Sequence, residues 1–395
     1  MSGTFPDGFL WGAATAGHQV EGGNINANMW PMEWAEGSVF AEPSGDACDH
    51  YHRYQEDIAT LAALGLNAYR FSVEWSRIEP ERGFFSRAAL DHYRRMAASC
   101  HEHAVTPVVT YSHFTTPRWF AAMGGWKEKS SPDLFGRFAE RVTAHLGDLV
   151  PWACTLNEPN LSDLLGQLGV TGAPETGLDE EKVAPIIGPG VEVMAKAHRR
   201  AVEAIKAGPG NTRAGWTLAL VDFQAADGGE EQCQKARQVV ELDWLEVSRE
   251  DDFVGVQTYT RARIGPNGAV PAEANDRPRT ENGWEFYPEA LEHTIGLAAA
   301  ATGGPVMVTE NGVATSDDGI RRAYTEEALA GVARCLSDGI DVRGYLHWSL
   351  LDNFEWMFGY GMHFGLIAVD RETFGRTIKP TARWLGEVAR ANRLP

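Results

Sequence analysis

The 395-residue sequence has no long apolar stretch and no dense run of basic residues. No window approaches the roughly 20 apolar residues of a membrane-spanning helix, and the N-terminus has no basic or apolar region typical of a secretory signal. The net charge of −19 argues against nucleic acid and other polyanions as partners. We therefore expect a cytoplasmic protein that binds neither a membrane nor nucleic acid.

Cysteine is scarce, and the five cysteines are widely spaced without a Cys-x-x-Cys pair. This pattern is typical of reduced, buried thiols and argues against a zinc site. Two histidine pairs, His50 with His52 and His101 with His103, are spaced by two residues, which places the members of each pair on different faces of a helix. We expect packing or surface roles for them, and no metal site.

Eight short runs rich in apolar and β-branched residues recur along the chain. Each run is continuously apolar rather than alternating, which is typical of parallel strands covered on both faces. The runs are Leu10–Ala16, Asn67–Val73, Val105–Tyr111, Pro151–Leu156, Ala214–Leu220, Phe253–Tyr259, Pro305–Thr309 and Val342–Leu350. Several gaps between them have apolar residues at helical spacing, such as Tyr54, Ile58 and Leu61 ahead of Gly65.

This alternation of strands and helices favours an α/β protein built as a single (β/α)8 barrel of the TIM type. The alternative is a doubly wound Rossmann sheet, which should carry G-x-G-x-x-G directly after its first strand. That motif is absent, as is a G-x-x-x-x-G-K-[ST] loop. Because the Gly- and Pro-rich segments read as barrel loops rather than linkers, the sequence predicts one catalytic domain over residues 1–395.

The residues that end the eight runs are polar and aromatic, and in such barrels the active site lies at this end of the strands. Two carboxylates directly follow an apolar run, Glu158 at the fourth and Glu310 at the seventh. Such a pair suits glycoside cleavage, because one acid protonates the leaving oxygen while the other carboxylate attacks or activates water. Aromatic side chains at the same rim offer flat apolar faces for sugar rings.

Five motifs resemble those of the family 1 glycoside hydrolases, the retaining β-glucosidases and β-galactosidases, and they occur in the family's order. They are Phe5–Ala16 with Gln19–Gly22, Tyr69–Ile78, Thr155–Pro159, Val308–Gly312 and Gly344–Trp356. The resemblance runs essentially from end to end. It implies a β-glucosidase that hydrolyses terminal β-linked glucosyl residues through a covalent glycosyl-enzyme, with a small-molecule β-glycoside as substrate and no cofactor.

The resemblance also implies which residues carry out the reaction. Glu158 matches the acid/base, and Glu310 matches the nucleophile. Asn157 matches the amide that bonds the sugar 2-hydroxyl, a contact that strengthens in the transition state. Arg70 and Tyr259 match the cation and the phenol that keep the nucleophile ionised and oriented.

A second set of positions matches the family's sugar-binding residues. By the resemblance, four of these residues hold the hydroxyls of the non-reducing sugar: Gln19, His113, Glu355 and Trp356. Trp348 matches an aromatic floor under the aglycone side. Phe364 matches an aromatic residue near the sugar's hydroxymethyl group.

Some positions depart from the family pattern. Gln257 and Thr258 stand where the family has Asn and Tyr, which predicts a shift in positioning near the nucleophile. Ser112, His347 and the segment Asn28–Glu33 also differ, which suggests an unusual acceptor side. The segment 161–177 is short, so we expect either an open aglycone cleft or one that a neighbouring subunit fills.

Two other functions fit the same motifs. A transglycosidase uses the same two steps but passes the sugar to an acceptor other than water. A catalytically weak sugar-binding protein would keep the barrel and lose turnover. The presence of both Glu158 and Glu310 argues against this alternative. The change at Gln257 and Thr258 leaves the alternative open. Galactosides or fucosides are alternative substrates, and the sequence leaves the oligomeric state open.

Overall fold

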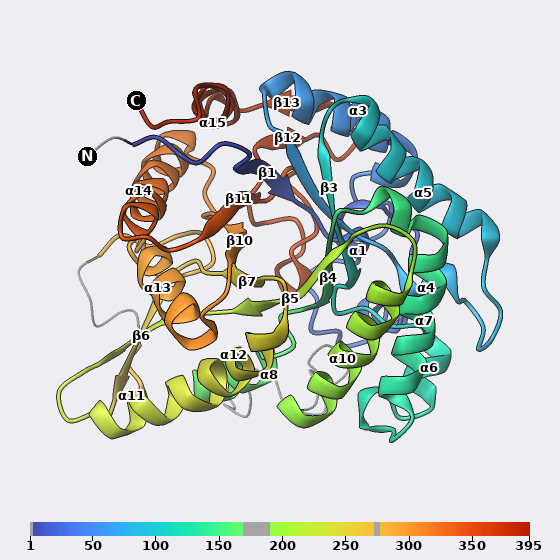
Figure 1. Ribbon diagram of the computed structural model, residues 1–395, viewed down its shortest axis with the longest axis horizontal. Coiled ribbons are helices and arrows are strands. Elements are labelled where there is room, and N and C mark those ends of the chain that lie inside the picture. Colours follow the sequence, from blue (N-terminus) through green and yellow to red (C-terminus); the bar gives the residue numbers. More distant parts are fainter. Residues whose placement is uncertain (1–2, 169–189, 272–276) are drawn as a thin grey trace.

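The computed structural model describes residues 3–168, 190–271 and 277–395, and its centre is a closed barrel of eight parallel strands (Figure 1). Around the barrel, the strand order is β1, β11, β10, β7, β5, β4, β3, β2. The strands span Leu10–Ala14 (β1), Ala68–Ser72 (β2), Thr106–Ser112 (β3), Trp152–Asn157 (β4), Arg213–Ala219 (β5), Val254–Gln257 (β7), Val306–Asn311 (β10) and Val342–Trp348 (β11). Each predicted run overlaps one of these strands, which confirms the (β/α)8 barrel and excludes the Rossmann alternative.

Helices follow the barrel strands and cover the outside of the barrel (Figure 1). The longer ones are α3 (His50–Leu64), α5 (Arg87–Glu102), α7 (Ser131–Leu146), α10 (Val191–Ala207), α11 (Glu230–Arg237), α13 (Ala290–Thr302), α14 (Asp318–Ser337) and α15 (Pro380–Ala391). Short helices lie in the loops: α1 (Gly17–Val20), α2 (Met29–Glu33), α4 (Trp75–Ile78), α6 (Arg118–Ala122), α8 (Leu161–Gln167) and α12 (Asp243–Val247). None of the helices in these described ranges is long and apolar enough to cross a lipid bilayer.

Two small sheets lie outside the barrel. One consists of β6 (Asp222–Ala225), β8 (Arg261–Gly265) and β9 (Gly268–Ala269), and the other of β12 (Ile367–Val369) and β13 (Arg376–Ile378). A 3-10 turn at Trp356–Phe358 precedes the second sheet. All five cysteines are buried and unpaired, as expected.

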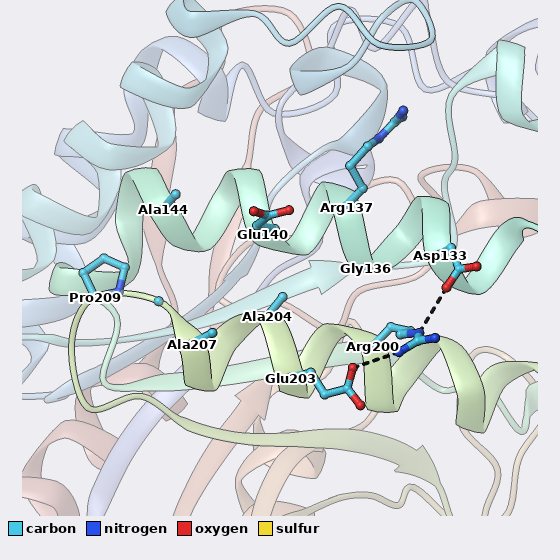
Figure 2. Close-up of a pocket in the computed structure, with 11 residues that line it drawn as sticks. Asp133, Gly136, Arg137, Glu140, Ala144, Arg200, Glu203, Ala204, Ala207 and Pro209 are labelled. Carbon is cyan, nitrogen blue, oxygen red and sulfur yellow. Dashed lines mark hydrogen bonds and ion pairs between the residues drawn. The ribbon is translucent and has the colours of Figure 1, made fainter.

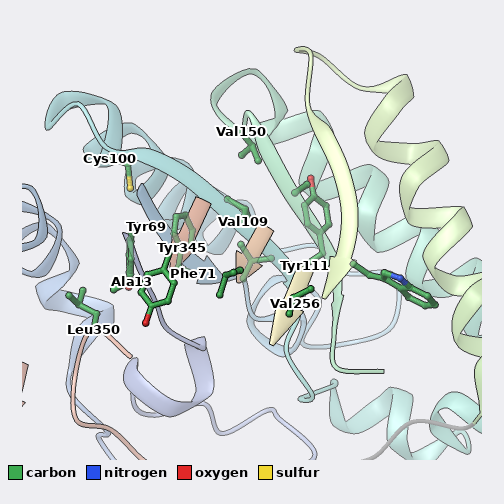
Figure 3. Close-up of a cluster of buried hydrophobic side chains, with 14 of the residues drawn as sticks. Ala13, Tyr69, Phe71, Cys100, Val109, Tyr111, Val150, Val256, Tyr345 and Leu350 are labelled. Carbon is green, nitrogen blue, oxygen red and sulfur yellow. The ribbon is translucent and has the colours of Figure 1, made fainter. Parts of the chain in front are cut away.

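The outward faces of the barrel strands pack against the helices. Figure 3 shows Tyr69 and Phe71 from β2 and Val109 and Tyr111 from β3 among these buried side chains. A second apolar cluster lies on the opposite strand faces. It takes residues from six barrel strands and the residue just before β7: Leu10, Ala68, Val108, Trp152, Cys154, Phe253, Met307 and Leu346. The strands are therefore buried on both faces, which explains their continuous hydrophobicity.

The inward apolar cluster forms a floor beneath the site. Side chains two residues apart on a strand share a face. The floor residues on β2, β3 and β11 are each followed, two positions nearer the carboxyl end, by a residue on the same inward face. These three residues are Arg70, Thr110 and Trp348. The strand pleat thus places a polar and aromatic layer at the mouth of the barrel.

The helix ring closes where the last helix packs against the first long one. In α15, Gly386 lies directly against the end of α3, and a Cβ at this position would collide with the carbonyl oxygen of Leu64. Glycine therefore permits the close approach of the two helices. By contrast, a Cβ on Gly296 in α13 would meet no atom within 4 Å.

These two glycines give a matched test of the packing. Gly386→Ala should destabilise the protein by about 1–3 kcal/mol, because backbone rather than a flexible side chain must move. Gly296→Ala should stabilise it by up to about 1 kcal/mol, because alanine favours the helix at a site with free space. Urea unfolding of both variants measures the two effects. Equal stability of the Gly386 variant and the wild type would contradict the close helix approach.

Candidate active site

Arg70 lies at the centre of the polar layer and is fully buried. Its Nη1 donates to Glu310 Oε1 at 2.5 Å, its Nη2 to Asn157 Oδ1 at 2.6 Å and its Nε to Thr110 Oγ1 at 2.9 Å. Burial disfavours the guanidinium charge, but Glu310, with Cys154 and Glu158, outweighs this effect, so that the pKa of Arg70 is raised. One cation from β2 therefore holds side chains from β3, β4 and β10.

Glu310 receives two further donors. Tyr259 Oη donates to Oε2 at 2.6 Å, and Gln257 Nε2 donates to Oε1 at 2.8 Å. Burial raises the pKa of Glu310, while Arg70 and Tyr259 oppose the shift. The pairing of β10 with β7 shifts register between Val308 and Glu310, and this irregularity brings Glu310 to the inner face next to Thr309.

Glu158 follows Asn157 at the end of β4 and has a left-handed φ of 44°. The pairing of β4 with β5 shifts register between Cys154 and Asn157, just before this turn. Burial, together with the charges of Glu310 and Glu355, raises the pKa of Glu158 well above its ordinary value. The arrangement favours a charged Glu310 beside a protonated Glu158, because two neighbouring carboxyls cannot easily ionise together.

Asn157 has an amide orientation that its neighbours determine. Its Oδ1 accepts from Arg70 Nη2, from Gln257 Nε2 at 2.9 Å and from Thr217 Oγ1 at 3.2 Å. Its Nδ2 consequently faces His113 Nε2 at 3.1 Å. Burial and the Arg70 charge lower the pKa of His113 well below its usual range, so the neutral ring accepts this bond.

Gln257 is the group whose role sequence reasoning missed. The sequence marked it as a strand-end departure from the family pattern that shifts positioning near the nucleophile, but did not predict that its Nε2 bridges Glu310 and Asn157. Its position at the end of a barrel strand was the one available signal. The bridge joins residues 53 and 100 positions away, which no local pattern reports.

A second group of predicted residues meets where β1 and β11 end. Gln19 Nε2 donates to Phe354 O at 2.8 Å, to Asn353 Oδ1 at 3.0 Å and to Glu355 Oε2 at 3.3 Å. Gln19 Oε1 is buried without a hydrogen-bond partner among the described residues, which leaves it as an acceptor for a ligand hydroxyl. Burial and the Glu310 charge raise the pKa of Glu355 to about 8, against hydrogen bonds from Trp348 and Gln19.

Aromatic rings surround these polar groups. The His113 ring lies nearly parallel to Trp348, with centroids 5.8 Å apart, and to Trp356, at 6.2 Å. Phe364 meets Tyr259 edge-on at 5.8 Å and packs against Trp348. The structure thus groups Trp348 with the residues expected at the non-reducing sugar.

The other departures have different surroundings. His347 is buried beside Tyr345 on the outer face of β11, and burial lowers its pKa to about 3. Glu33, in the unusual segment Asn28–Glu33, is buried as well. In the short segment 161–177, the residues from 169 onward lie outside the described residues. Exposed Trp284, which the sequence did not single out, contacts Tyr259 at 5.5 Å.

The described ranges contain no group of three or more His, Cys, Asp or Glu side chains arranged to hold a metal ion. Packing or surface roles were expected for the pair His50 and His52. His50 is buried against Asp57 and Tyr69, and His52 is exposed. A groove of about 600 Å³ lies elsewhere, between α7 and α10 on the outer wall (Figure 2). The surface ion pair between Arg200 and Asp133 crosses it, and it contains none of the predicted site residues.

Comparisons with known proteins agree with this geometry. The sequence matches the family described as glycosyl hydrolase family 1 over residues 1–248 and 239–394. β-Glucosidase A from Acetivibrio thermocellus is 30% identical, over 98% of this chain and 99% of its own.

Solved structures agree as well. The crystal structure of β-glycosidase BGL167 has 53% identity and a TM-score of 0.94, covering 99% of this chain and 98% of its own. A β-glucosidase from Thermotoga maritima in complex with glucoimidazole has 29% identity and a TM-score of 0.88, covering 99% of this chain and 100% of its own.

The raised pKa of Glu355 predicts a pH-dependent stability. Because the folded protein holds this proton more tightly than the unfolded chain, stability should fall as pH rises from the ordinary value of 4.5 to about 8. The Gln side chain of Glu355→Gln does not titrate. The melting temperature of this variant, relative to that of the wild type, should therefore rise as the pH increases across this window.

Thermal melts from about pH 5 to about pH 9 measure the difference. Glu387→Gln removes a glutamate at an exposed site on α15 and measures the effect of such a substitution itself. If the gap between the Glu355 variant and the wild type stays constant with pH, Glu355 titrates alike in both states and its burial has no electrostatic cost.

Proposed function

The chain belongs to glycosyl hydrolase family 1, and from this premise we propose that it is a retaining β-glucosidase that removes terminal β-linked glucosyl residues. The observation that carries the proposal is the unequal setting of two neighbouring carboxyls. Glu310 accepts hydrogen bonds from Arg70, Tyr259 and Gln257, whereas Glu158 has a pKa raised by burial and by the Glu310 charge. The names of the relatives and the glucoimidazole complex of one of them support glucose as the sugar.

The first step forms a covalent glycosyl-enzyme. The Glu310 carboxylate attacks the anomeric carbon while the bond from that carbon to the leaving oxygen breaks, and Glu158 donates its proton to that oxygen. Tyr259 and Arg70 keep Glu310 ionised and oriented for the attack. As the oxocarbenium-like transition state forms, Asn157 Nδ2 donates to the sugar 2-hydroxyl.

The second step releases the sugar. Glu158, now a carboxylate, takes a proton from water, the water oxygen bonds to the anomeric carbon, and Glu310 departs as a carboxylate. Two inversions leave the product in the β configuration. An acceptor other than water would enter at this point, which is how a transglycosidase would differ.

The sugar itself lies between the polar and aromatic groups at the ends of β1 and β11. Gln19 Oε1 and Glu355 accept hydrogen bonds from its outer hydroxyls, and His113 and Trp356 hold the same end. Because Trp348 stacks on His113 and packs against Phe364, we place Trp348 under the sugar rather than under the aglycone. Phe364 then lies near the hydroxymethyl group.

We also propose that residues 1–395 form one catalytic domain that acts in the cytoplasm. Barrel strands extend from Leu10 to Trp348, and α15 returns to pack against α3. Five buried, unpaired cysteines are typical of a reducing compartment.

The covalent mechanism is tested by removing the nucleophile. Glu310→Gly should abolish hydrolysis of an aryl β-glucoside, and azide should partly restore cleavage by attacking from the vacated side to give an α-glucosyl azide. NMR of the first product of the wild type should show the β-anomer. A first-formed α-anomer would rule out retention, and absence of azide rescue would remove Glu310 from the nucleophile's role.

The acid role of Glu158 is tested through pH and leaving group. The profile of kcat/KM should be a bell whose alkaline limb follows loss of the Glu158 proton and whose acid limb follows protonation of Glu310. Because both pKa values are raised, both limbs should lie above the ordinary range of a glutamate. Glu158→Gln should remove the alkaline limb.

The same variant should lower kcat/KM on alkyl glucosides by about a hundredfold or more, since general acid catalysis contributes at least that much. It should affect aryl glucosides with good leaving groups far less, because these need no protonation. Equal losses on both substrates would contradict the role of Glu158 as the acid.

A further inference from the structure

A buried hydrogen bond between a histidine and a carboxyl group lies behind the aromatic side of the site. His18, in α1 directly after β1, places Nε2 2.6 Å from Glu33 Oε1 at the end of α2, and both side chains have no exposed surface. The other Glu33 oxygen accepts from the backbone N and the Oγ of Ser44, at 2.8 and 2.6 Å. A buried carboxylate costs desolvation free energy, which these hydrogen bonds to Glu33 offset.

The imidazole of His18 is held at both of its nitrogens. Besides the Glu33 contact at Nε2, Asn24 Nδ2 lies 3.1 Å from His18 Nδ1, and the same amide donates to Glu74 Oε2 at 2.7 Å. The backbone N–H of His18 donates to Glu74 Oε1 at 3.0 Å. The ring plane therefore has no freedom to rotate without breaking a hydrogen bond.

This fixed ring lies against Trp356. The two rings are parallel within 2°, with centroids 5.7 Å apart, in the range of an offset stack. Trp356 begins a 3-10 turn with a left-handed φ of 49° and is only half-buried, so the surroundings must hold it in place. His18 is the contact of Trp356 that is itself fixed by a buried carboxylate.

We propose that the His18–Glu33 pair is a positioning device for Trp356 and thereby sets selection at the outer hydroxyls of the non-reducing sugar. The inference rests on the proposed function, in which Trp356 contacts that sugar. His18 is a positioning residue, because its contacts are with Glu33, Asn24 and the indole. The unusual segment Asn28–Glu33 then serves the sugar end of the site, whereas the sequence suggested the acceptor side.

A purely structural role for the pair makes a different prediction. If His18 and Glu33 only joined α1 to α2, their loss would lower the stability of the protein. It would also lower kcat/KM by the same factor on every substrate. The chain offers a matched control in the outer layer, where buried His198 contacts Asp251 at 3.0 Å and stacks on Trp216 at 4.5 Å. This second pair has the same chemistry, and the other His198 nitrogen lies 2.7 Å from Thr155 Oγ1 of β4, which is not a predicted site residue.

The experiment compares aryl β-glucoside, β-galactoside and β-xyloside, which differ at the 4-hydroxyl and the hydroxymethyl group. His18→Ala should lower kcat/KM on the glucoside about tenfold, mainly through KM, and change the xyloside about threefold or less. Its ratio of glucoside to galactoside should also fall. His18→Phe keeps an aromatic face but loses the hydrogen bond to Glu33, so it should retain the altered substrate ratios. His198→Ala should lower the melting temperature and leave all three substrate ratios unchanged.

An equal loss on all three substrates, as with His198→Ala, would overturn the proposal. If His18→Ala does not fold, Glu33→Gln decides the matter, because it keeps the shape of the core and removes the charge; unchanged ratios in that variant would also overturn it. Failure of the proposed function shows separately, as a wild type without β-glucosidase activity or a Glu310→Gly variant without azide rescue.

Discussion

The buried guanidinium of Arg70 joins the polar groups at the barrel mouth through its hydrogen bonds to Glu310, Asn157 and Thr110. It donates to the Glu310 carboxylate, which stays charged in the proposed mechanism, and to Asn157 Oδ1, which leaves the Asn157 N–H groups to donate elsewhere. Burial and, after it, the charge on Glu310 raise the pKa of Glu158 and of Glu355. Without the cation, burial alone would favour a neutral Glu310, and the proposed division of roles between the two carboxyls would be lost.

The barrel makes this arrangement possible because it places polar groups above an apolar floor. Arg70 lies one pleat above Ala68, so its charge is surrounded by hydrogen-bond partners at the mouth rather than by the hydrocarbon beneath. In β4 and β10, a shift of register precedes Asn157 and Glu310. These irregularities turn polar side chains inward where regular alternation would not.

Much of this could be predicted from the sequence, because the responsible patterns are local. Continuous apolar runs mark strands buried on both faces, and Glu158 and Glu310 stand directly after two of them. The structure brings both carboxyls together with Arg70 and Tyr259, and Gln19 with Glu355. The bridge formed by Gln257 and the pair of His18 with Glu33 were not predicted, since their partners lie far away in the sequence or in an irregular loop.

By itself, the sequence determined the barrel, the order of its strands along the chain and the residue types at the carboxyl ends. These follow from hydrophobic periodicity and from residue spacing, which act over a few positions. Only the tertiary structure decided which oxygen of Glu310 meets which donor, that Trp348 lies with His113 and Phe364, and that Glu33 reaches His18. Such contacts depend on small shifts of register and on the orientation of the rings. Both arise only when all eight strands close around one another.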